Sequence, residues 1–206
     1  MLPKCTIRWY DVIDSTNSEA RRLLEGLDNL SVIAATCQTA GRGQGDHKWA
    51  SAPGDNLTFT TVMRFSENQD GISLMTSEIL QITCVTTLAI RDFLLDNGIE
   101  ARIKWPNDIW VGDKKICGIL IENILDGAKV RDSIVGIGLN LNQTSWPSDI
   151  PNPVSMKLLT GRNFEPHAAL EALHEKIRLR FGQLATNEGR INLEAEFRQH
   201  MFRLEA

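Results

Sequence analysis

Residues 101–141 read ARIKWPNDIWVGDKKICGILIENILDGAKVRDSIVGIGLNL, and this stretch decides the fold class. It holds four segments rich in β-branched and apolar residues, at 101–105, 109–111, 115–125 and 131–141. Gly112-Asp113 separates the second segment from the third, and Asp126-Gly127 separates the third from the fourth. Because Asp-Gly between two strands is a strong hairpin signal, the stretch predicts antiparallel strands that follow one another along the chain.

Strand and helix patterns continue on both sides of this stretch. Further strands are predicted at 6–10, 31–37 and 57–65, with long loops at 38–55 and 145–153. Helical periodicity predicts helices at 74–95, 166–184 and 192–204. A shorter helix is expected to start at Thr16, because Thr16 and Glu19 have the spacing of a capping box. The pattern predicts an α+β fold, a mostly antiparallel mixed sheet backed by helices, and a single domain over residues 1–206.

Composition and charge exclude several classes of protein. The chain has 206 residues, of which 42% are hydrophobic, and a formal net charge of -4. No apolar run approaches the roughly 20 residues that a membrane span needs, and the N-terminus lacks the apolar core of a signal peptide. The acidic balance argues against a protein whose main task is to coat nucleic acid. Four scattered cysteines form no C-x-x-C pair, so we expect neither a disulfide framework nor a zinc site, and we expect a cytoplasmic location.

The first candidate site is the glycine-rich loop Gln38-Thr39-Ala40-Gly41-Arg42-Gly43-Gln44-Gly45-Asp46-His47-Lys48-Trp49. Glycines let backbone N–H groups approach an anion, and Arg42 offers a planar fork for a carboxylate or a phosphate. The loop matches neither a Walker motif nor a dinucleotide fingerprint. A solvent-exposed glycine-rich turn is the alternative interpretation.

The second candidate site is Lys104-Trp105-Pro106-Asn107-Asp108, followed by Lys115 and Gly118 after a turn. Two lysines, an amide and a carboxylate at one end of a hairpin suit a polyphosphate and its Mg²⁺. A surface turn with ordinary charges is the alternative. A third segment, residues 136–142, places glycines in a strand, which predicts close approach of a ligand or, alternatively, a bulge in a packed sheet.

Taken together and in this order, these segments resemble the catalytic domain of the biotin–protein ligases, whose fold is that of the class II synthetase-like biotin/lipoate ligases. The matching segments are Asp14-Ser15-Thr16-Asn17, residues 38–43, Lys48-Trp49, residues 104–108, Lys115 with residues 118–120, and residues 138–140. The resemblance implies that biotin and ATP form biotinyl-5′-AMP, from which biotin passes to a lysine of a biotin carboxyl carrier domain. It implies Mg²⁺ with the ATP, and a homodimer is one expectation from it.

The resemblance also implies a role for individual residues. Biotin-binding residues are expected at Ser15, Thr16, Asn17, Gln38, Gly41, Arg42, Gly43, Gln44, Lys115, Gly118, Leu120 and Gly136. ATP-binding residues are expected at Arg42, Gln44, Trp49, Lys104, Asn107, Asp108 and Asn140, with Asp108 as the candidate Mg²⁺ ligand. Lys115, Arg42 and Lys104 are the expected catalytic residues, and Lys115 is the first choice for stabilising the transition state.

The chain departs from the family pattern in three places. Gln44 replaces the second arginine of the glycine-rich loop, and Asp46 stands where glycine is common, so we expect weaker retention of biotinyl-AMP. The first motif begins at residue 14, so we expect no N-terminal DNA-binding domain and no DNA partner. The chain ends soon after the last predicted helix, so we expect no C-terminal SH3-like barrel.

Two other functions stay open at this stage. A lipoate– or octanoate–protein ligase shares the fold and the acyl-adenylate logic, although the Gln38 to Gly43 pattern and residues 104–108 favour biotin. A biotin- or nucleotide-binding sensor without turnover is the second alternative, and Gln44, Asp46 and the expected absence of a C-terminal barrel are its best support. The role of Trp146 is also open, since it could stack on adenine or pack its loop against the sheet.

Overall fold

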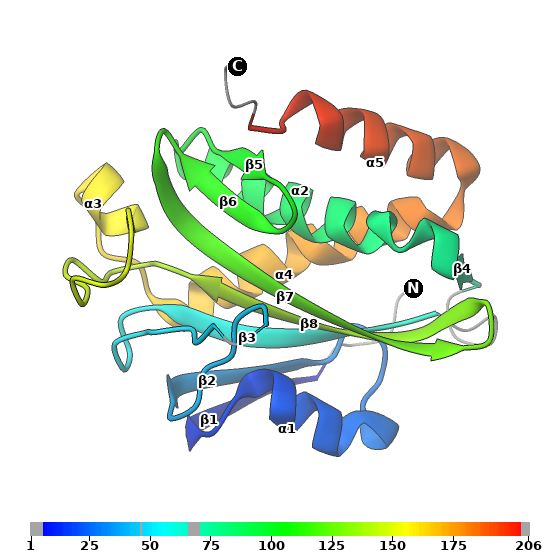
Figure 1. Ribbon diagram of the computed structural model, residues 1–206, viewed down its shortest axis with the longest axis horizontal. Coiled ribbons are helices and arrows are strands. Elements are labelled where there is room, and N and C mark those ends of the chain that lie inside the picture. Colours follow the sequence, from blue (N-terminus) through cyan, green and yellow to red (C-terminus); the bar gives the residue numbers. More distant parts are fainter. Residues whose placement is uncertain (1–5, 46, 66–70, 203–206) are drawn as a thin grey trace. The chain divides into compact units, whose positions relative to one another are not determined.

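The computed structural model of the chain describes residues 6–45, 47–65 and 71–202 (Figure 1). Its contacts divide the chain into two compact units. Unit 1 comprises Met1–Leu80 and Ile119–Gly138, and unit 2 comprises Gln81–Gly118 and Leu139–Ala206. The expectation of a single domain, and those about segments before and after it, stay predictions.

The strands are β1 (Ile7–Ile13), β2 (Val32–Gln38), β3 (Leu57–Arg64), β4 (Leu74–Met75), β5 (Arg102–Lys104), β6 (Asp108–Val111), β7 (Lys114–Asp126) and β8 (Lys129–Leu139). Hydrogen-bonded neighbours follow the order β1-β2-β3-β8-β7-β6-β5, and β4 pairs with β8. Strands β1 and β2 are parallel, whereas β2–β3, β4–β8, β5–β6 and β6–β7 are antiparallel. The predicted mostly antiparallel mixed sheet and the α+β class are therefore confirmed.

Unit 1 is built around the crossover between its two parallel strands. Parallel neighbours need a crossover connection, and α1 (Thr16–Leu23) with the short η1 (Leu24–Gly26) supplies it. Helix α1 packs against β2 and β3 (Figure 1). Ala20, Leu24 and Leu27 bury their side chains there against Ile33 and Val62. This packing fixes the start of α1, where three of the predicted biotin-binding residues lie.

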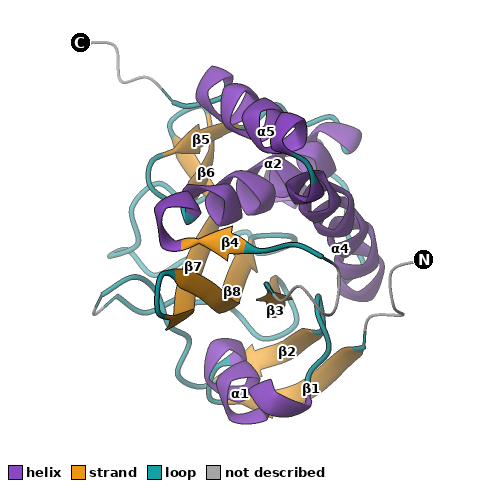
Figure 2. Cartoon of the chain, turned by 90° about the vertical axis from the view of Figure 1, so that its right-hand side faces the viewer, coloured by secondary structure: helices purple, strands orange, loops and turns teal. Residues whose placement is uncertain are grey.

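Unit 2 contains nearly all of α2 (Leu80–Asp96), as well as α3 (Met156–Thr160), α4 (Pro166–Gly182), η3 (Gln183–Ala185) and α5 (Asn187–Gln199). The long helices α2, α4 and α5 lie side by side (Figure 2). Arg180 of α4 joins them, because its guanidinium forms ion pairs with Asp92 of α2 at 2.7 Å and with Glu196 of α5 at 2.6 Å. The Arg180 side chain is only 14% exposed, so loss of its charge would leave two carboxylates without their main partner.

Two predicted helix starts and one predicted helix cap differ from the structure, whereas the helix expected from Thr16 does begin there. The helix expected from residue 74 begins at Leu80, because Leu74 and Met75 pair with β8 and Thr76–Glu78 forms the 3-10 turn η2. The last helix begins at Asn187 rather than residue 192, because the Thr186 hydroxyl caps it by accepting the Gly189 N–H. The capping box at Thr16 is wrong, since Thr16 is already helical and its hydroxyl bonds elsewhere.

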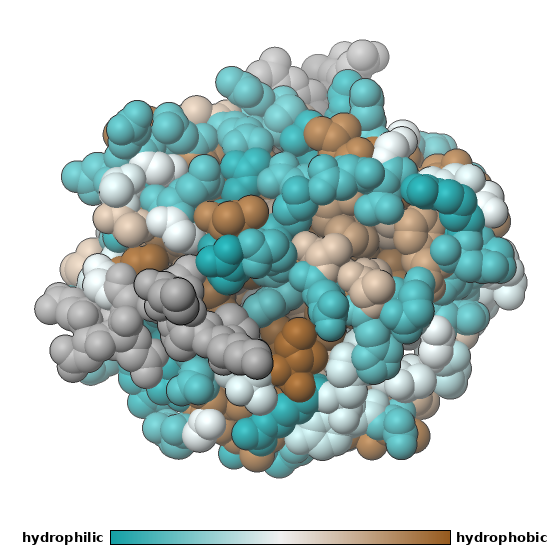
Figure 3. All heavy atoms as spheres, turned by 180° about the vertical axis from the view of Figure 1, so that it is seen from behind, coloured by the Kyte–Doolittle hydropathy of each residue, from teal (hydrophilic) through white to brown (hydrophobic). Residues whose placement is uncertain are grey.

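The surface shows no large apolar area on the face drawn in Figure 3, where hydrophobic residues form small separate patches among hydrophilic ones. The most exposed large hydrophobic side chains include Val12, Trp105 and Ile191. Within the described residues, no helix combines the length and the apolarity that crossing a membrane requires. Cys37, Cys84 and Cys117 are free thiols, and Cys5 lies outside the described residues.

Candidate active site

The predicted site residues fall into two groups, one in each unit. Unit 1 holds the start of α1, the glycine-rich loop and Gly136. Unit 2 holds the hairpin of β5 and β6, the first residues of β7 and Asn140. Gly118 and Leu120 are neighbours on β7, to either side of the boundary between the units.

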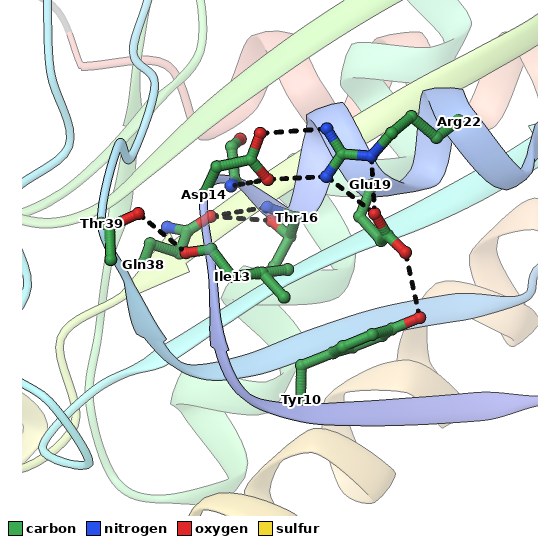
Figure 4. Close-up of polar contacts among 9 residues, drawn as sticks. Tyr10, Ile13, Asp14, Thr16, Glu19, Arg22, Gln38 and Thr39 are labelled. Atoms are coloured by element: carbon green, nitrogen blue, oxygen red, sulfur yellow. Dashed lines mark hydrogen bonds and ion pairs between the residues drawn. The ribbon is translucent and has the colours of Figure 1, made fainter.

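The start of α1 is bonded to the end of β2 through Gln38 (Figure 4). Gln38 Oε1 accepts the backbone N–H of Thr16 at 2.8 Å and its hydroxyl at 3.1 Å. Both bonds use the oxygen of the Gln38 amide, so its nitrogen remains available as a donor of two hydrogen bonds. This nitrogen donates to no residue in the described part of the chain. Ser15, the residue before Thr16, is only 2% exposed.

Asp14 holds this turn in place at the start of the helix. Its carboxylate accepts the Ser15 N–H at 2.8 Å and two bonds from the Arg22 guanidinium, at 2.7 and 3.0 Å (Figure 4). The hydrogen bonds from Arg22, followed by that from Ser15, lower the pKa of Asp14 from 3.8 to about 2. The turn that presents Ser15 and Thr16 is thereby fixed at neutral pH.

Asn17 is bonded on both sides to the protein. Its Nδ2 donates to Glu122 at 2.9 Å, and its Oδ1 accepts the Thr60 hydroxyl at 2.6 Å. A Cβ on Gly136 would overlap Asn17 Oδ1, so the glycine at this position of β8 makes room for the Asn17 amide. The close approach predicted for this strand is therefore made by a side chain of the protein itself.

The glycine-rich loop forms a small hairpin. Arg42 and Lys48 form an antiparallel bridge, the Trp49 N–H donates to the Gly41 carbonyl at 3.0 Å, and the Gly43 N–H donates to the His47 carbonyl at 2.8 Å. A Cβ on Gly41 would lie 2.5 Å from the Trp49 carbonyl oxygen, so this position requires glycine. Gln44 lies at the exposed tip, and Asp46 lies outside the described residues. The tip of this hairpin is an exposed turn, as one of the two interpretations expected. The other interpretation, an anion-binding site, stays a prediction.

Trp49 lies at the base of this hairpin and covers β8. A Cβ on Gly138 would overlap the Trp49 indole ring, so the ring lies directly on the backbone of that strand. Gly136 and Gly138 face the same side of β8, because alternate residues of a strand share a face. The two glycines therefore receive one side chain each, from α1 and from the hairpin.

Arg42 is held by Glu122 of β7. Its two terminal nitrogens lie 3.1 Å from the two carboxylate oxygens of Glu122, which is the bidentate arrangement of an arginine–carboxylate pair. Burial alone would raise the pKa of Glu122, but hydrogen bonds from Asn17 and Arg42 outweigh it, so this pKa lies below its ordinary value. Glu122 also contacts Arg21 at 3.4 Å.

In unit 2, a β-bulge decides which way Lys115 points. Ile109 pairs with Cys117 but Trp110 pairs with Lys115, so Ile116 is the extra residue on β7. A shift of one residue moves the preceding side chains to the other face of a strand, and here it moves Lys115 to the face of Asp108. Lys115 Nζ then lies 2.8 Å from Asp108 Oδ1.

Lys104 lies on the same hairpin and contacts an aromatic ring. Its Nζ lies 3.8 Å from the centroid of the Trp110 ring, a cation–π contact, and the Trp110 ring in turn contacts Phe202. Lys104 pairs with Asp108 in the β5–β6 register. Lys104, Asp108, Trp110 and Lys115 therefore share one face of strands β5, β6 and β7. The sequence predicts that the two lysines, Asn107 and Asp108 converge at one end of a hairpin.

Asn140 is fixed at the end of β8. Its N–H donates to the Ile116 carbonyl and its Nδ2 to the Val154 carbonyl, both at 3.0 Å, while its buried Oδ1 bonds to none of the described residues. Lys115 is bonded to the loop after Asn140, because its N–H donates to the Asn152 carbonyl at 2.8 Å. Trp146 of that loop is partly buried, and both of its interpretations stay open.

The candidate metal ligand Asp108 is not part of a cluster of three or more metal-ligating side chains in the described part of the chain. Among residues 6–45, 47–65 and 71–202 no three His, Cys, Asp or Glu side chains cluster as a metal site. One carboxylate fits an ion that keeps most of its waters and is held mainly by substrate phosphates, which is the usual behaviour of Mg²⁺.

Two residues that contact the predicted site residues of unit 1, Thr60 and Glu122, were not predicted from the sequence. Thr60 of β3 forms hydrogen bonds with both Thr16 and Asn17. The same strand also contains Thr58 and Thr61, so residue type alone could not single out Thr60. Glu122 could have been found from the sequence, because it is a charged residue that directly follows the apolar run 119–121 within a predicted strand.

Comparison with known proteins places this geometry in a family. Residues 9–140 match the model of the biotin/lipoate A/B protein ligase family. The biotin–[acetyl-CoA-carboxylase] ligase of Paracoccus denitrificans is 37% identical over 168 residues, which are 78% of this chain and 66% of that protein. The bifunctional ligase/repressor BirA of Bacillus subtilis is 34% identical over 146 residues, 70% of this chain and 42% of that protein. The chain therefore spans less than two thirds of the length of these two relatives.

A solved structure agrees in fold. The biotin protein ligase from Aquifex aeolicus in complex with biotin and ATP is 26% identical and superposes with a TM-score of 0.75, covering 96% of this chain and 78% of the other. The family model spans more than half of the 206 residues, from Trp9 to Asn140. The chain belongs to the biotin/lipoate A/B protein ligase family.

Proposed function

We propose that this chain is an ATP-dependent biotin–protein ligase. The polar group at Ser15, Thr16 and Gln38 is the observation that carries the choice of biotin. The ureido ring of biotin has two N–H donors and one carbonyl acceptor, whereas the dithiolane of lipoate and the tail of octanoate have none. The hydroxyl of Ser15 and the amide nitrogen of Gln38 suit the polar ureido ring, and they would face no polar group in an apolar acyl chain.

In the first step, an oxygen of the biotin carboxylate attacks the α-phosphorus of ATP. The new O–P bond gives biotinyl-5′-AMP, and the bond between the α- and β-phosphates breaks to release pyrophosphate. Two anions must meet for this attack, so cations have to offset their repulsion. We assign Arg42 to the carboxylate side, Lys115 to the charge that grows on the α-phosphate, and Lys104 to the leaving pyrophosphate.

In the second step, a neutral lysine amine of a carrier domain attacks the acyl carbon to form a C–N amide bond, AMP leaves with the electrons of the broken acyl C–O bond, and the amine nitrogen gives up one proton to solvent. Mg²⁺ bound with ATP would neutralise phosphate charge, with Asp108 as its protein ligand. Asn107 and Asn140 are assigned to ATP, and Trp49 to the wall beside the nucleotide or the acyl chain. A carrier domain as partner, a homodimer and a cytoplasmic location accompany this proposal as predictions.

The test is a competition among acyl substrates. The chain is incubated with equal concentrations of biotin, lipoate and octanoate together with Mg-ATP, and the acyl-adenylates are quantified by mass spectrometry. Biotinyl-AMP is expected to exceed the other two by about 100-fold, because unpaired buried polar groups reject an apolar analogue strongly. Thr16→Val should erode this preference, and Thr6→Val, a matched change at an exposed residue just before β1, should leave it intact.

Other outcomes identify the alternatives. A predominance of lipoyl- or octanoyl-AMP would make the chain a lipoate or octanoate ligase. Calorimetric binding of biotin without any adenylate would support a sensor. Transfer to an added carrier domain then separates a complete ligase from a chain that only makes the adenylate.

A further inference from the structure

Glu122 is a carboxylate that bonds to a residue assigned to bind substrate anions. Both of its oxygens lie 3.1 Å from Arg42, so the guanidinium already has the bidentate partner that a substrate anion would be. Arg42 cannot present the same pair of N–H groups to Glu122 and to a second carboxylate. An anion therefore has to compete with Glu122 for it.

The contacts of both residues allow such an exchange. The Arg42 side chain is 44% exposed while that of Glu122 is 19% exposed, so the arginine is free to turn and the carboxylate is not. The backbone of Arg42 is fixed by its bridge to Lys48, so the guanidinium can change partner without movement of the hairpin. Besides Arg42, Glu122 contacts the Asn17 amide at 2.9 Å and Arg21 at 3.4 Å, and neither contact depends on the Arg42 guanidinium. Its charge is thus never left unpaired, which would otherwise oppose the exchange.

We propose that Glu122 is the internal counter-ion of Arg42 and sets how strongly this site prefers an anionic ligand to a neutral ligand of the same shape. This inference rests on the proposed function, because it takes the biotin carboxylate as the competing anion. Glu122 acts through Arg42 and is a positioning residue rather than a catalytic one.

The experiment compares biotin with biotinamide, which has the same ring and chain but no charge. Affinities are measured by calorimetry without ATP for the parent, Glu122→Gln and Glu25→Gln. Glutamine keeps an oxygen for Asn17 and removes the competing charge. Glu25 is the matched control, because it is an exposed glutamate of the same unit that pairs with Arg131 and lies outside the site.

Glu122→Gln is expected to bind biotin about 3- to 5-fold more tightly, the upper part of the range for loss of one partly exposed ion pair, and to bind biotinamide within about twofold of the parent. Glu25→Gln should change neither affinity by more than about twofold. The gain in biotin affinity should vanish when Arg42→Gln is added to Glu122→Gln, because the guanidinium for which Glu122 and the ligand compete is then absent.

Equal weakening of both ligands in Glu122→Gln would overturn the inference and show that Glu122 only orients Asn17. An unchanged ratio of the two affinities would overturn it as well. A parent chain that binds neither ligand would instead contradict the proposed function, so the two failures are distinguishable.

Discussion

Lys115 Nζ lies 2.8 Å from Asp108 Oδ1, and the bulge at Ile116 brings the two side chains to the same face of the sheet. Without that extra residue Lys115 would face the other side. The pair keeps a lysine and a carboxylate ready at one position, where ATP phosphates and a hydrated Mg²⁺ need opposite charges.

Asp108→Asn should slow adenylate formation and raise the MgCl2 concentration that gives half of the maximal rate several-fold. The amide keeps the shape of the side chain but loses the charge that attracts the ion. The rate is followed by mass spectrometry of biotinyl-AMP against MgCl2 concentration. Asp113→Asn, at the exposed turn of the same hairpin, is the control. An unchanged Mg²⁺ dependence in Asp108→Asn would show that Asp108 serves only to orient Lys115.

Gln38→Glu should weaken biotin binding by at least about tenfold while the chain stays folded. A carboxylate can still accept both Thr16 donors, but it cannot donate to the ureido carbonyl as the amide nitrogen can. Calorimetry gives the affinity and thermal unfolding gives the stability, with Thr6→Val, at an exposed residue just before β1, as the control. Biotin affinity equal to that of the parent would mean that Gln38 only supports the start of α1.

The low pKa of Asp14 predicts a pH-dependent contribution to stability. Because this pKa is lowered from 3.8 to about 2 in the folded chain, the contribution is complete above 3.8 and is lost as the pH falls toward 2. The difference in melting temperature between the parent and Asp14→Asn should therefore be constant near pH 6 and should shrink at pH 3. Arg22→Gln removes the main cause and should flatten the same dependence. A difference that stays constant down to pH 3 would contradict the assignment.

Gln44→Arg should slow the release of biotinyl-AMP. The tip of the hairpin carries an uncharged side chain at Gln44, and an arginine there would add a cation for the phosphate. Release is measured by stopped-flow displacement, with Gln44→Met as a neutral variant of similar length. If the parent releases the adenylate no faster than Gln44→Arg does, this account of the departure at Gln44 fails.

The sequence predicted most of the fold because periodicity and turn residues are local signals. Asp126-Gly127 does end β7, and Gly127 has the positive φ of 57° that favours glycine. The helix expected at 74–95 is present as α2, but its predicted start was wrong because pairing of Leu74 with Val130 of β8 depends on a distant segment. The pattern of residues around position 74 carries no information about a partner strand so far away in the sequence.

The site could be predicted only as far as its motifs. Residue types and the family resemblance predicted roles for Gln38, Arg42, Lys115 and Asp108, but the partners of these side chains depend on tertiary structure. A bulge one residue long sets the face of Lys115, and Glu122 reaches Arg42 across 80 residues of sequence. For the same reason Gly136 and Gly138 indicated close approach, while only the structure shows that Asn17 and Trp49 are what approaches.

The most direct test of the central claim is the rate of biotinyl-AMP formation from biotin and Mg-ATP in Lys115→Ala and Lys114→Ala. The two lysines are adjacent on β7, but only Lys115 faces Asp108, and Lys114 is exposed. Lys115→Ala should lose about 100-fold or more in rate, the usual cost of removing one group that stabilises transition-state charge, while Lys114→Ala should stay within about twofold of the parent. Equal rates in the two variants, both forming the adenylate as fast as the parent, would contradict the assignment of Lys115 and with it this account of the site.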